Sequence, residues 1–163
     1  MKTRELVTAA LLAALSLAIP LAFGGFLMVQ VPPWTATIAS HVPLFLSMLV
    51  SPLAALMVGA VSALGFFIKV GPVVGARAAM HILVGGVGAN LVRREVPFRN
   101  ALLIVLPIHA VSEALIVLPF GWSLANAGVV VAVGTALHHL VDTAIALSLA
   151  GILAKINLAF WRH

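Results

Sequence analysis

The longest stretch without charge sets the strongest limit on what this chain can fold into. Residues 6–68 contain no Asp, Glu, Lys or Arg. A water-soluble fold keeps charged side chains on its surface, so a stretch of this length argues against one. A hydrocarbon core needs about 20 apolar residues per helical crossing, which gives this stretch about three crossings and their turns. The apolar runs are continuous rather than alternating, which predicts helices and not a membrane barrel.

The rest of the chain has the same character, with 63% hydrophobic and 8% charged residues among 163. We expect an all-α, multi-pass protein of the cell membrane, with one domain over 1–163 and the lipid bilayer as its surroundings. No glycine-rich turn ends in Lys-Ser or Lys-Thr, so any ATP-driven work needs another subunit. The net charge of +5 comes from basic residues placed as in a membrane protein, so we expect no nucleic-acid partner.

Proline, glycine and charge divide the chain into six predicted transmembrane helices. Pro32–Pro33, Ser51–Pro52 and Gly71–Pro72 break the apolar pattern, and residues 93–99 form a polar loop. The predicted helices cover approximately 5–24, 34–50, 52–69, 74–92, 100–118 and 126–155.

The distribution of Lys and Arg predicts that both termini lie in the cytoplasm. In this arrangement the outer side holds Lys69 and, at most, Arg77. Basic residues favour the cytoplasmic side of a membrane protein. The cytoplasmic side then holds Lys2, Arg4, Arg93, Arg94, Arg99, Lys155 and Arg162.

Ionisable residues within the predicted spans gather in the outer half of the bilayer. At about 1.5 Å of rise per residue, Arg77 and His81 lie one turn apart in that half, and Glu113 lies near the outer surface. Ionisable groups in a bilayer normally face a cavity or one another, so the pattern predicts a polar pocket that opens outward. A channel or proton relay would need polar residues through the full thickness. The candidate ligand-binding residues are Arg77, His81, His41, Trp34, Glu113 and His138.

Each of these residues also has a purely structural interpretation. His109–Glu113 and His138–Asp142 are i, i+4 pairs that can satisfy each other. Arg77 can extend to the outer interface. Because Glu113 lies nearer the outer surface, we expect it to line the pocket and Asp142 to serve the fold.

A ladder of small residues runs along the first predicted helix. Ala10, Ala14 and Ala18 recur at every fourth position and continue to Ala22, with Ala9 and Ala13 widening the stripe. Small residues at this spacing let another helix approach closely in a membrane. The ladder therefore predicts either packing within the bundle or a docking face for a separate protein.

These features resemble the substrate-binding S components of energy-coupling factor (ECF) transporters. Those proteins share six short helices, an N-terminal basic-acidic cap and the alanine spacing in the first helix. Residues 31–52 (VPPWTATIASHVPLFLSMLVSP), 65–67 (GFF) and 74–82 (VGARAAMHI) are similar to the nicotinate group of S components. The resemblance implies a non-enzymatic subunit that captures a vitamin from outside at high affinity.

The resemblance also implies partners and a means of transport. A transmembrane coupling protein and two ATPases would drive uptake as the S component topples, and the alanine ladder would contact the coupling protein. The outer loops, at about 24–33 and 69–73, would cover the pocket.

The residues favour a small aromatic acid as ligand. The Arg77 guanidinium can hold a carboxylate through two parallel hydrogen bonds. Trp34, Phe66 and Phe67 offer ring faces, while His41, His81 or His138 can hydrogen-bond a pyridine nitrogen. His41 can equally bond a backbone carbonyl of another helix.

Two alternatives remain from other function classes. A metal-transporting subunit could use ligands from His109, Glu113, His138, His139 and Asp142. Against it, the histidines form no compact motif and Arg77 would repel a cation. A small metal-dependent membrane enzyme could use the same residues, but no catalytic triad or nucleophilic Cys is present. We therefore expect no enzymatic activity, no cofactor and no metal site.

Overall fold

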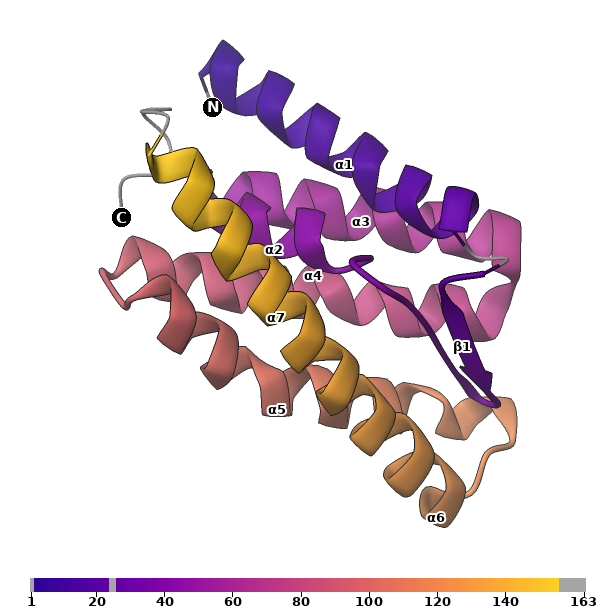
Figure 1. The fold of residues 1–163 in the computed structure, drawn as a ribbon. Coiled ribbons are helices and arrows are strands. Elements are labelled where there is room, and N and C mark those ends of the chain that lie inside the picture. Colours follow the sequence, from indigo (N-terminus) through magenta and orange to yellow (C-terminus); the bar gives the residue numbers. More distant parts are fainter. Residues whose placement is uncertain (1, 24–25, 156–163) are drawn as a thin grey trace.

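The computed structural model describes residues 2–23 and 26–155, which form a helical bundle with one short hairpin (Figure 1). Residues 24–25 of the predicted outer loop and Arg162 lie outside this part. The helices are α1 (Thr3–Phe23), α2 (Val42–Met48), α3 (Pro52–Val70), α4 (Pro72–Arg93), α5 (Phe98–Ile116), η1 (Leu118–Phe120), α6 (Leu124–Asn126), η2 (Ala127–Val131) and α7 (Ala132–Lys155). The strands are β1 (Met28–Val31) and β2 (Trp34–Thr37).

Five helical segments in this part are long and apolar enough to cross a membrane. They are formed by α1, α3, α4, α5 with η1, and η2 with α7. Prolines at the first positions of α3 and α4 fit helix starts, because proline lacks the amide hydrogen that would be left unpaired there. The chain is thus a helical, multi-pass membrane protein.

The prediction of a long helix over 34–50 is wrong. The antiparallel hairpin pairs Met28 with Thr37 and Val31 with Trp34. Within 34–50, only the seven residues of α2 are helical. Hydrophobicity alone cannot distinguish the two structures, whereas the β-branched residues around Pro32–Pro33 favour strands.

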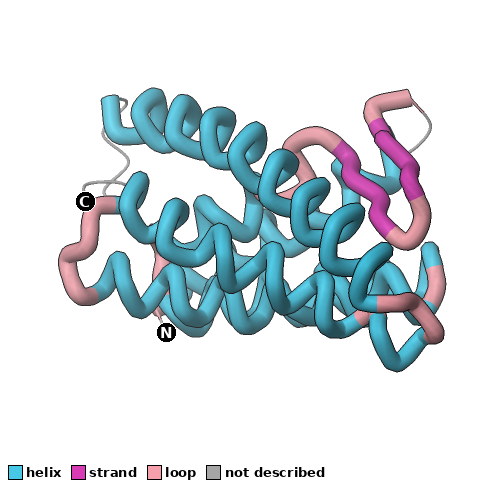
Figure 2. The backbone as a smooth tube through the Cα atoms, turned by 90° about the horizontal axis from the view of Figure 1, so that it is seen from below, coloured by secondary structure: helices cyan, strands magenta, loops and turns pink. Residues whose placement is uncertain are grey.

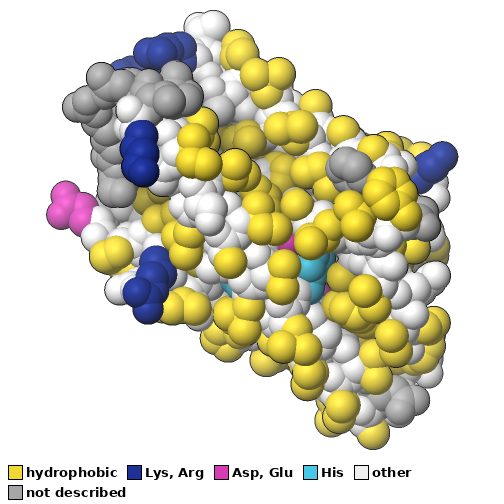
Figure 3. Space-filling view, viewed as in Figure 1, with side chains coloured by type: hydrophobic (Ala, Val, Ile, Leu, Met, Phe, Trp, Pro, Cys, Tyr) yellow, Lys and Arg dark blue, Asp and Glu magenta, His cyan; other side chains and the backbone are white. Residues whose placement is uncertain are grey.

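The short α2 still returns the chain to the end of the bundle where α3 begins. The end of α2 borders the same cavity as the α4–α5 connection, at the opposite end from the hairpin (Figure 2). The two termini of the ribbon and the α4–α5 connection share that end (Figure 1). Most of the basic side chains in view also gather there (Figure 3). This arrangement is compatible with the predicted N-in, C-in topology.

Close approach of α3 and α4 positions one of the predicted pocket residues. A Cβ added to Gly59 of α3 would lie 2.9 Å from the backbone carbon of His81 on α4. Glycine at this position therefore lets the two helices approach closely at the turn that carries His81.

Apolar and polar layers alternate along the bundle. The main apolar core fills the half near the α4–α5 connection, with Phe45, Met48, Val84 and Leu102 at its centre. A smaller apolar cluster around Val131 closes the hairpin end. The buried ionisable side chains lie between these two clusters along α4, α5 and α7, so packing on both sides fixes the polar layer.

Candidate functional site

A pocket lies between the hairpin and helices α1, α3, α4, α5 and α7. Of the six predicted binding residues, five line it: His41, Arg77, His81, Glu113 and His138. Imidazole and carboxylate atoms are visible through a gap in an otherwise apolar surface (Figure 3).

Glu113 on α5 forms the centre of the site. Its Oε2 accepts hydrogen bonds from Arg77 Nε at 3.1 Å and from Arg77 Nη2 at 2.6 Å. The same oxygen accepts a hydrogen bond of 2.7 Å from the Thr135 hydroxyl. Both members of the Arg77–Glu113 ion pair are buried. A carboxylate among these donors is held in its charged form.

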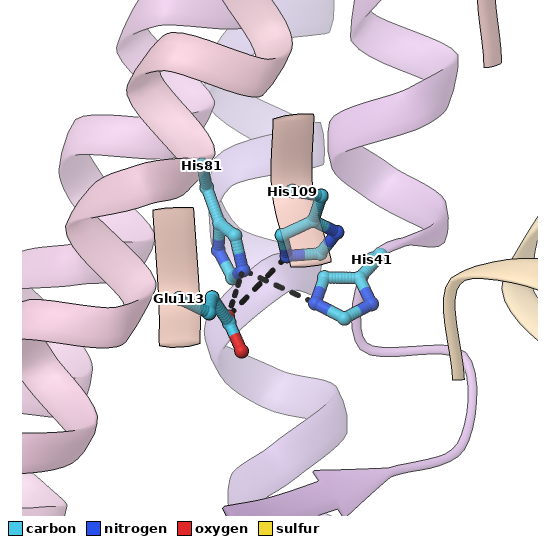
Figure 4. A group of neighbouring side chains, drawn as sticks. All are labelled: His41, His81, His109 and Glu113. Atoms are coloured by element: carbon cyan, nitrogen blue, oxygen red, sulfur yellow. Dashed lines mark hydrogen bonds and ion pairs between the residues drawn. The ribbon is translucent and has the colours of Figure 1, made fainter. Parts of the chain in front are cut away.

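The other oxygen of Glu113 faces three histidines from three different segments. Oε1 lies 3.3 Å from His109 Nε2 and 3.6 Å from His81 Nε2. His81 Nε2 in turn lies 3.1 Å from His41 Nε2. The rings of all three histidines converge with the carboxylate (Figure 4). Glu113 therefore joins a guanidinium on one side to an imidazole cluster on the other.

A line of hydrogen bonds connects this cluster to the apolar core. His109 Nδ1 lies 3.0 Å from His139 Nδ1, and His139 Nε2 lies 3.0 Å from the Leu102 carbonyl oxygen. A carbonyl oxygen only accepts, so the hydrogen of His139 is on Nε2. Both histidine rings are buried completely.

Asp142 on α7 bonds to backbone groups. Its carboxylate accepts hydrogen bonds from the Ala39 amide at 2.8 Å and from the His41 amide at 2.9 Å. Ala39 has a positive φ of 66°, which is uncommon for a residue with a side chain. His138 Nε2 lies 3.1 Å from the carboxylate and 3.0 Å from the Thr37 carbonyl oxygen. Asp142 thus holds the turn that connects β2 to α2.

Arg77 also satisfies carbonyl groups of the hairpin. Its Nη1 donates to the Pro33 carbonyl at 3.3 Å, and Nη2 donates to the Thr35 carbonyl at 3.5 Å. Non-helical backbone at membrane depth needs partners within the protein. Side chains from α4 and α7 supply those partners, which explains how a hairpin fits into this bundle.

Not every predicted aromatic residue lines the pocket. Phe66 does, whereas Phe67 is largely exposed. Trp34 packs against α7 behind the pocket wall, where a Cβ on Gly134 would lie 2.6 Å from its indole ring. The Trp34 indole nitrogen is buried and has no hydrogen-bond partner within the described residues.

Several residues that line the pocket were not predicted from the sequence. Gln30, Thr35 and Thr37 line the pocket from the hairpin. The hydroxyl of Thr135 reaches Glu113 from α7. Thr135 lies seven residues before Asp142, so helical spacing predicts that the two share a face. The hairpin residues gave no such signal.

The alanine ladder faces away from the bundle. Ala10, Ala14 and Ala18 are exposed along α1. Ala9 and Ala13 are buried against the bundle, so the expectation that they widen the same stripe is wrong.

One curated relative places the chain in a family. The chain is 33% identical to the niacin transporter NiaX of Lactococcus lactis subsp. cremoris (strain MG1363). The alignment extends over 172 residues and takes in 94% of this chain and 76% of that relative. No protein-family model and no solved structure matches the chain. The relative is a transporter rather than an enzyme, and the chain belongs to the family of niacin-type S components.

Proposed function

We propose that this protein is the high-affinity capture subunit of an ECF-type vitamin transporter, with nicotinate or a similar small aromatic carboxylate as ligand. The observation that carries the proposal is a buried arginine on the wall of a pocket in a membrane protein of this family. A buried cation in a bilayer whose hydrogen bonds on one edge are long marks a site for an anion. The family does not favour the metal-cargo alternative.

The guanidinium of Arg77 has one strong edge and one weak edge. Glu113 occupies the edge formed by Nε and Nη2, with distances of 3.1 and 2.6 Å. The contacts of Nη1 and Nη2 with hairpin carbonyls are longer, at 3.3 and 3.5 Å. A ligand carboxylate can replace these weaker contacts and form two charge-assisted hydrogen bonds there.

The rest of the pocket suits an aromatic ring with a nitrogen. Phe66 supplies an apolar ring at the wall, and His41, His81 and His138 supply ring nitrogens. Because the Pro33 and Thr35 carbonyls share Arg77 with the ligand, capture is coupled to the position of the hairpin. The hairpin then takes the covering role that the resemblance to S components implies for the outer loops.

This chain has no ATP-binding motif, so ATP-driven transport requires other subunits that bind ATP. We propose a transmembrane coupling protein and two ATPases as partners, with Ala10, Ala14 and Ala18 as the docking face. Exposure of these residues on α1 supports a contact outside the bundle. Close helix approach over small residues is a common form of helix association in membranes.

Binding of nicotinate to the purified protein in lipid nanodiscs, measured by titration calorimetry, tests the ligand. Arg77→Ala should weaken binding by about 2–5 kcal/mol, because it truncates a buried charge contact. Arg94→Ala is the matched control, because Arg94 is exposed at the opposite end of the bundle. Nicotinate binding of equal strength in Arg77→Ala and wild type would remove Arg77 from the site.

Copurification with the coupling protein tests the docking face. Ala14→Leu and Ala18→Trp should block assembly and leave nicotinate binding unchanged, because both positions are exposed. Ala13→Leu, directed into the bundle, should instead impair folding. Val111→Trp is the control on an exposed surface of α5. Normal assembly of the Ala14 and Ala18 variants would exclude this face.

A further inference from the structure

We propose that His41, His81 and His109, together with Glu113, bind a divalent transition-metal ion of the zinc class at the floor of the pocket. The ring nitrogen of the captured ligand takes the exchangeable position on this ion. The ligand's identity rests on the proposed function above, whereas the metal site rests on the geometry of four side chains.

The four ligand atoms have the spacing of a tetrahedral site. One ring nitrogen from each histidine and one carboxylate oxygen of Glu113 all lie within 4.8 Å of one another. The shorter separations are 3.1 Å for His41–His81, 3.3 Å for His109–Glu113 and 3.6 Å for His81–Glu113. Zinc bonds of about 2.0–2.1 Å in tetrahedral geometry place neighbouring ligand atoms about 3.3 Å apart. The cluster is therefore the right size for one ion.

The hydrogen-bond pattern places two acceptors, one from His109 and one from Glu113, face to face. His139 Nε2 donates to the Leu102 carbonyl, so a neutral His139 presents a bare Nδ1. His109 Nδ1 must then donate to it across 3.0 Å, which leaves a lone pair on His109 Nε2. That lone pair faces a carboxylate oxygen at 3.3 Å. Two acceptors this close need a positive ion between them, either a proton or a metal.

The charge balance of the polar layer favours the metal. Arg77, Glu113 and Asp142 are the buried formally charged side chains within the described residues. With neutral imidazoles, the layer has a net charge of minus one, which opposes capture of an anion. A divalent cation makes the net charge of the layer positive. Glu113 also separates the two cations, because Arg77 contacts Oε2 and the histidines face Oε1.

Groups behind the ligands orient them as metal sites require. Metal-bound histidines usually direct their second ring nitrogen at a carboxylate or another acceptor. His109 has His139 in this place, and His41 Nδ1 lies 3.1 Å from Asp142 Oδ2. His41 Nδ1 and Asp142 Oδ2 are close enough for a hydrogen bond, but their angle is unfavourable. A small rotation of the His41 ring would form the bond.

A second combination of His41, His138 and Asp142 is the weaker candidate. The Asp142 carboxylate already accepts hydrogen bonds from two backbone amides. His138 Nε2 donates to the Thr37 carbonyl, which leaves no lone pair on that nitrogen. These groups serve the hairpin turn, and the metal is placed in the other cluster.

The position of Glu113 Oε1, which the ligand nitrogen would take on the ion, explains the preference for a nitrogen heterocycle. Three imidazoles with one displaceable oxygen match sites in which zinc keeps an exchangeable ligand. Pyridine nitrogen is a ligand of the same kind as imidazole. A pyridine carboxylate can then contact the metal and Arg77 from opposite sides of one ring.

Cobalt spectroscopy of the purified protein in nanodiscs tests the metal site. Co²⁺ should give the visible bands of a tetrahedral ion, and zinc should abolish them. The chain contains no cysteine, so His81→Cys introduces a single thiolate. This variant should keep cobalt and add a sulfur-to-cobalt charge-transfer band, which also shows that it is folded. His138→Asn should keep the wild-type spectrum. Absence of tetrahedral bands in wild type, or of the new band in a His81→Cys protein that retains the wild-type helical content, would overturn the site.

Ligand titration separates this inference from the proposed function. Nicotinate should bind at least about tenfold more tightly with zinc than with a chelator, a change of about 1.4 kcal/mol. Benzoate, which lacks the ring nitrogen, should show no such difference. Equal nicotinate affinity in both conditions would refute coordination and leave the proposed function intact. Cobalt bands without nicotinate binding in either condition would refute the proposed function and its coordinated ligand.

Discussion

The bundle contains two buried carboxylate centres that lie close together but have different kinds of partner. The Glu113 centre consists of side chains, with Arg77, Thr135 and His109 around the carboxylate. The Asp142 centre consists largely of backbone, because its carboxylate accepts from the amides of Ala39 and His41. Both centres include histidines, so their composition alone does not distinguish them.

The kind of partner indicates the role of each carboxylate. Backbone amides are fixed by the path of the chain, so the Asp142 centre holds a turn in place. Side chains can exchange partners when a ligand arrives, and the Glu113 centre lines the pocket. This difference supports a binding role for Glu113 and a structural role for Asp142.

The largest expected effect comes from separating the buried ion pair. Glu113→Gln leaves Arg77 buried without a counter-charge, which should cost about 3–5 kcal/mol of stability. The double variant Arg77→Met/Glu113→Gln should recover most of this loss, yet bind nicotinate poorly. Unfolding in mixed micelles and nicotinate titration measure the two properties. A double variant no more stable than Glu113→Gln would show that the pair does not act as a unit.

A smaller loss is expected at the Asp142 centre. Asp142→Asn removes the charge that two backbone amides share, at a cost of about 1.5–3 kcal/mol. Because those partners are backbone, no second side-chain change should restore stability. Asp142→Asn/His138→Asn should therefore remain at least as unstable as Asp142→Asn in the same unfolding measurement. Recovery in that double variant would mean that Asp142 depends on His138, as Glu113 depends on Arg77.

The smallest effect is expected from a single hydroxyl. Thr135→Val removes one hydrogen bond to Glu113 and should cost about 1 kcal/mol. Thr143→Val is the matched control, since the Thr143 hydroxyl is buried on the same helix without a hydrogen-bond partner in the described residues. Replacing that hydroxyl should leave the free energy of unfolding unchanged or raise it. Equal losses in the two variants would indicate a packing effect rather than a bond to Glu113.

The sequence predicts the membrane-spanning helices because continuous apolar runs have few alternatives in a bilayer. The segment 34–50 is an exception, because its backbone obtains hydrogen-bond partners from Asp142, His138 and Arg77. Those partners lie far away in the sequence. The β-branched residues around Pro32–Pro33 favour strands, but no local pattern shows that side chains distant in the sequence supply the hydrogen-bond partners of the hairpin.

The polar layer is predictable in composition but not in pairing. Depth along each helix brings Arg77, His81 and Glu113 into one layer. Helical spacing also predicts the contact between His109 and Glu113, which the structure contains. The rotation of each helix about its own axis decides which side chains of the layer meet. For this reason the sequence does not predict the Arg77–Glu113 pair or the His41–His81 contact, which only the structure shows. The apparent scatter of the histidines in the sequence conceals a compact cluster.

A structure of the nicotinate complex is the most direct test of the account. We expect a carboxylate within hydrogen-bond distance of the Arg77 Nη atoms, about 2.7–2.9 Å away, in place of the Pro33 and Thr35 carbonyl contacts. Glu113 should remain on the opposite edge of the guanidinium. A ligand bound outside this pocket, or in it with its carboxylate away from Arg77, would contradict the account.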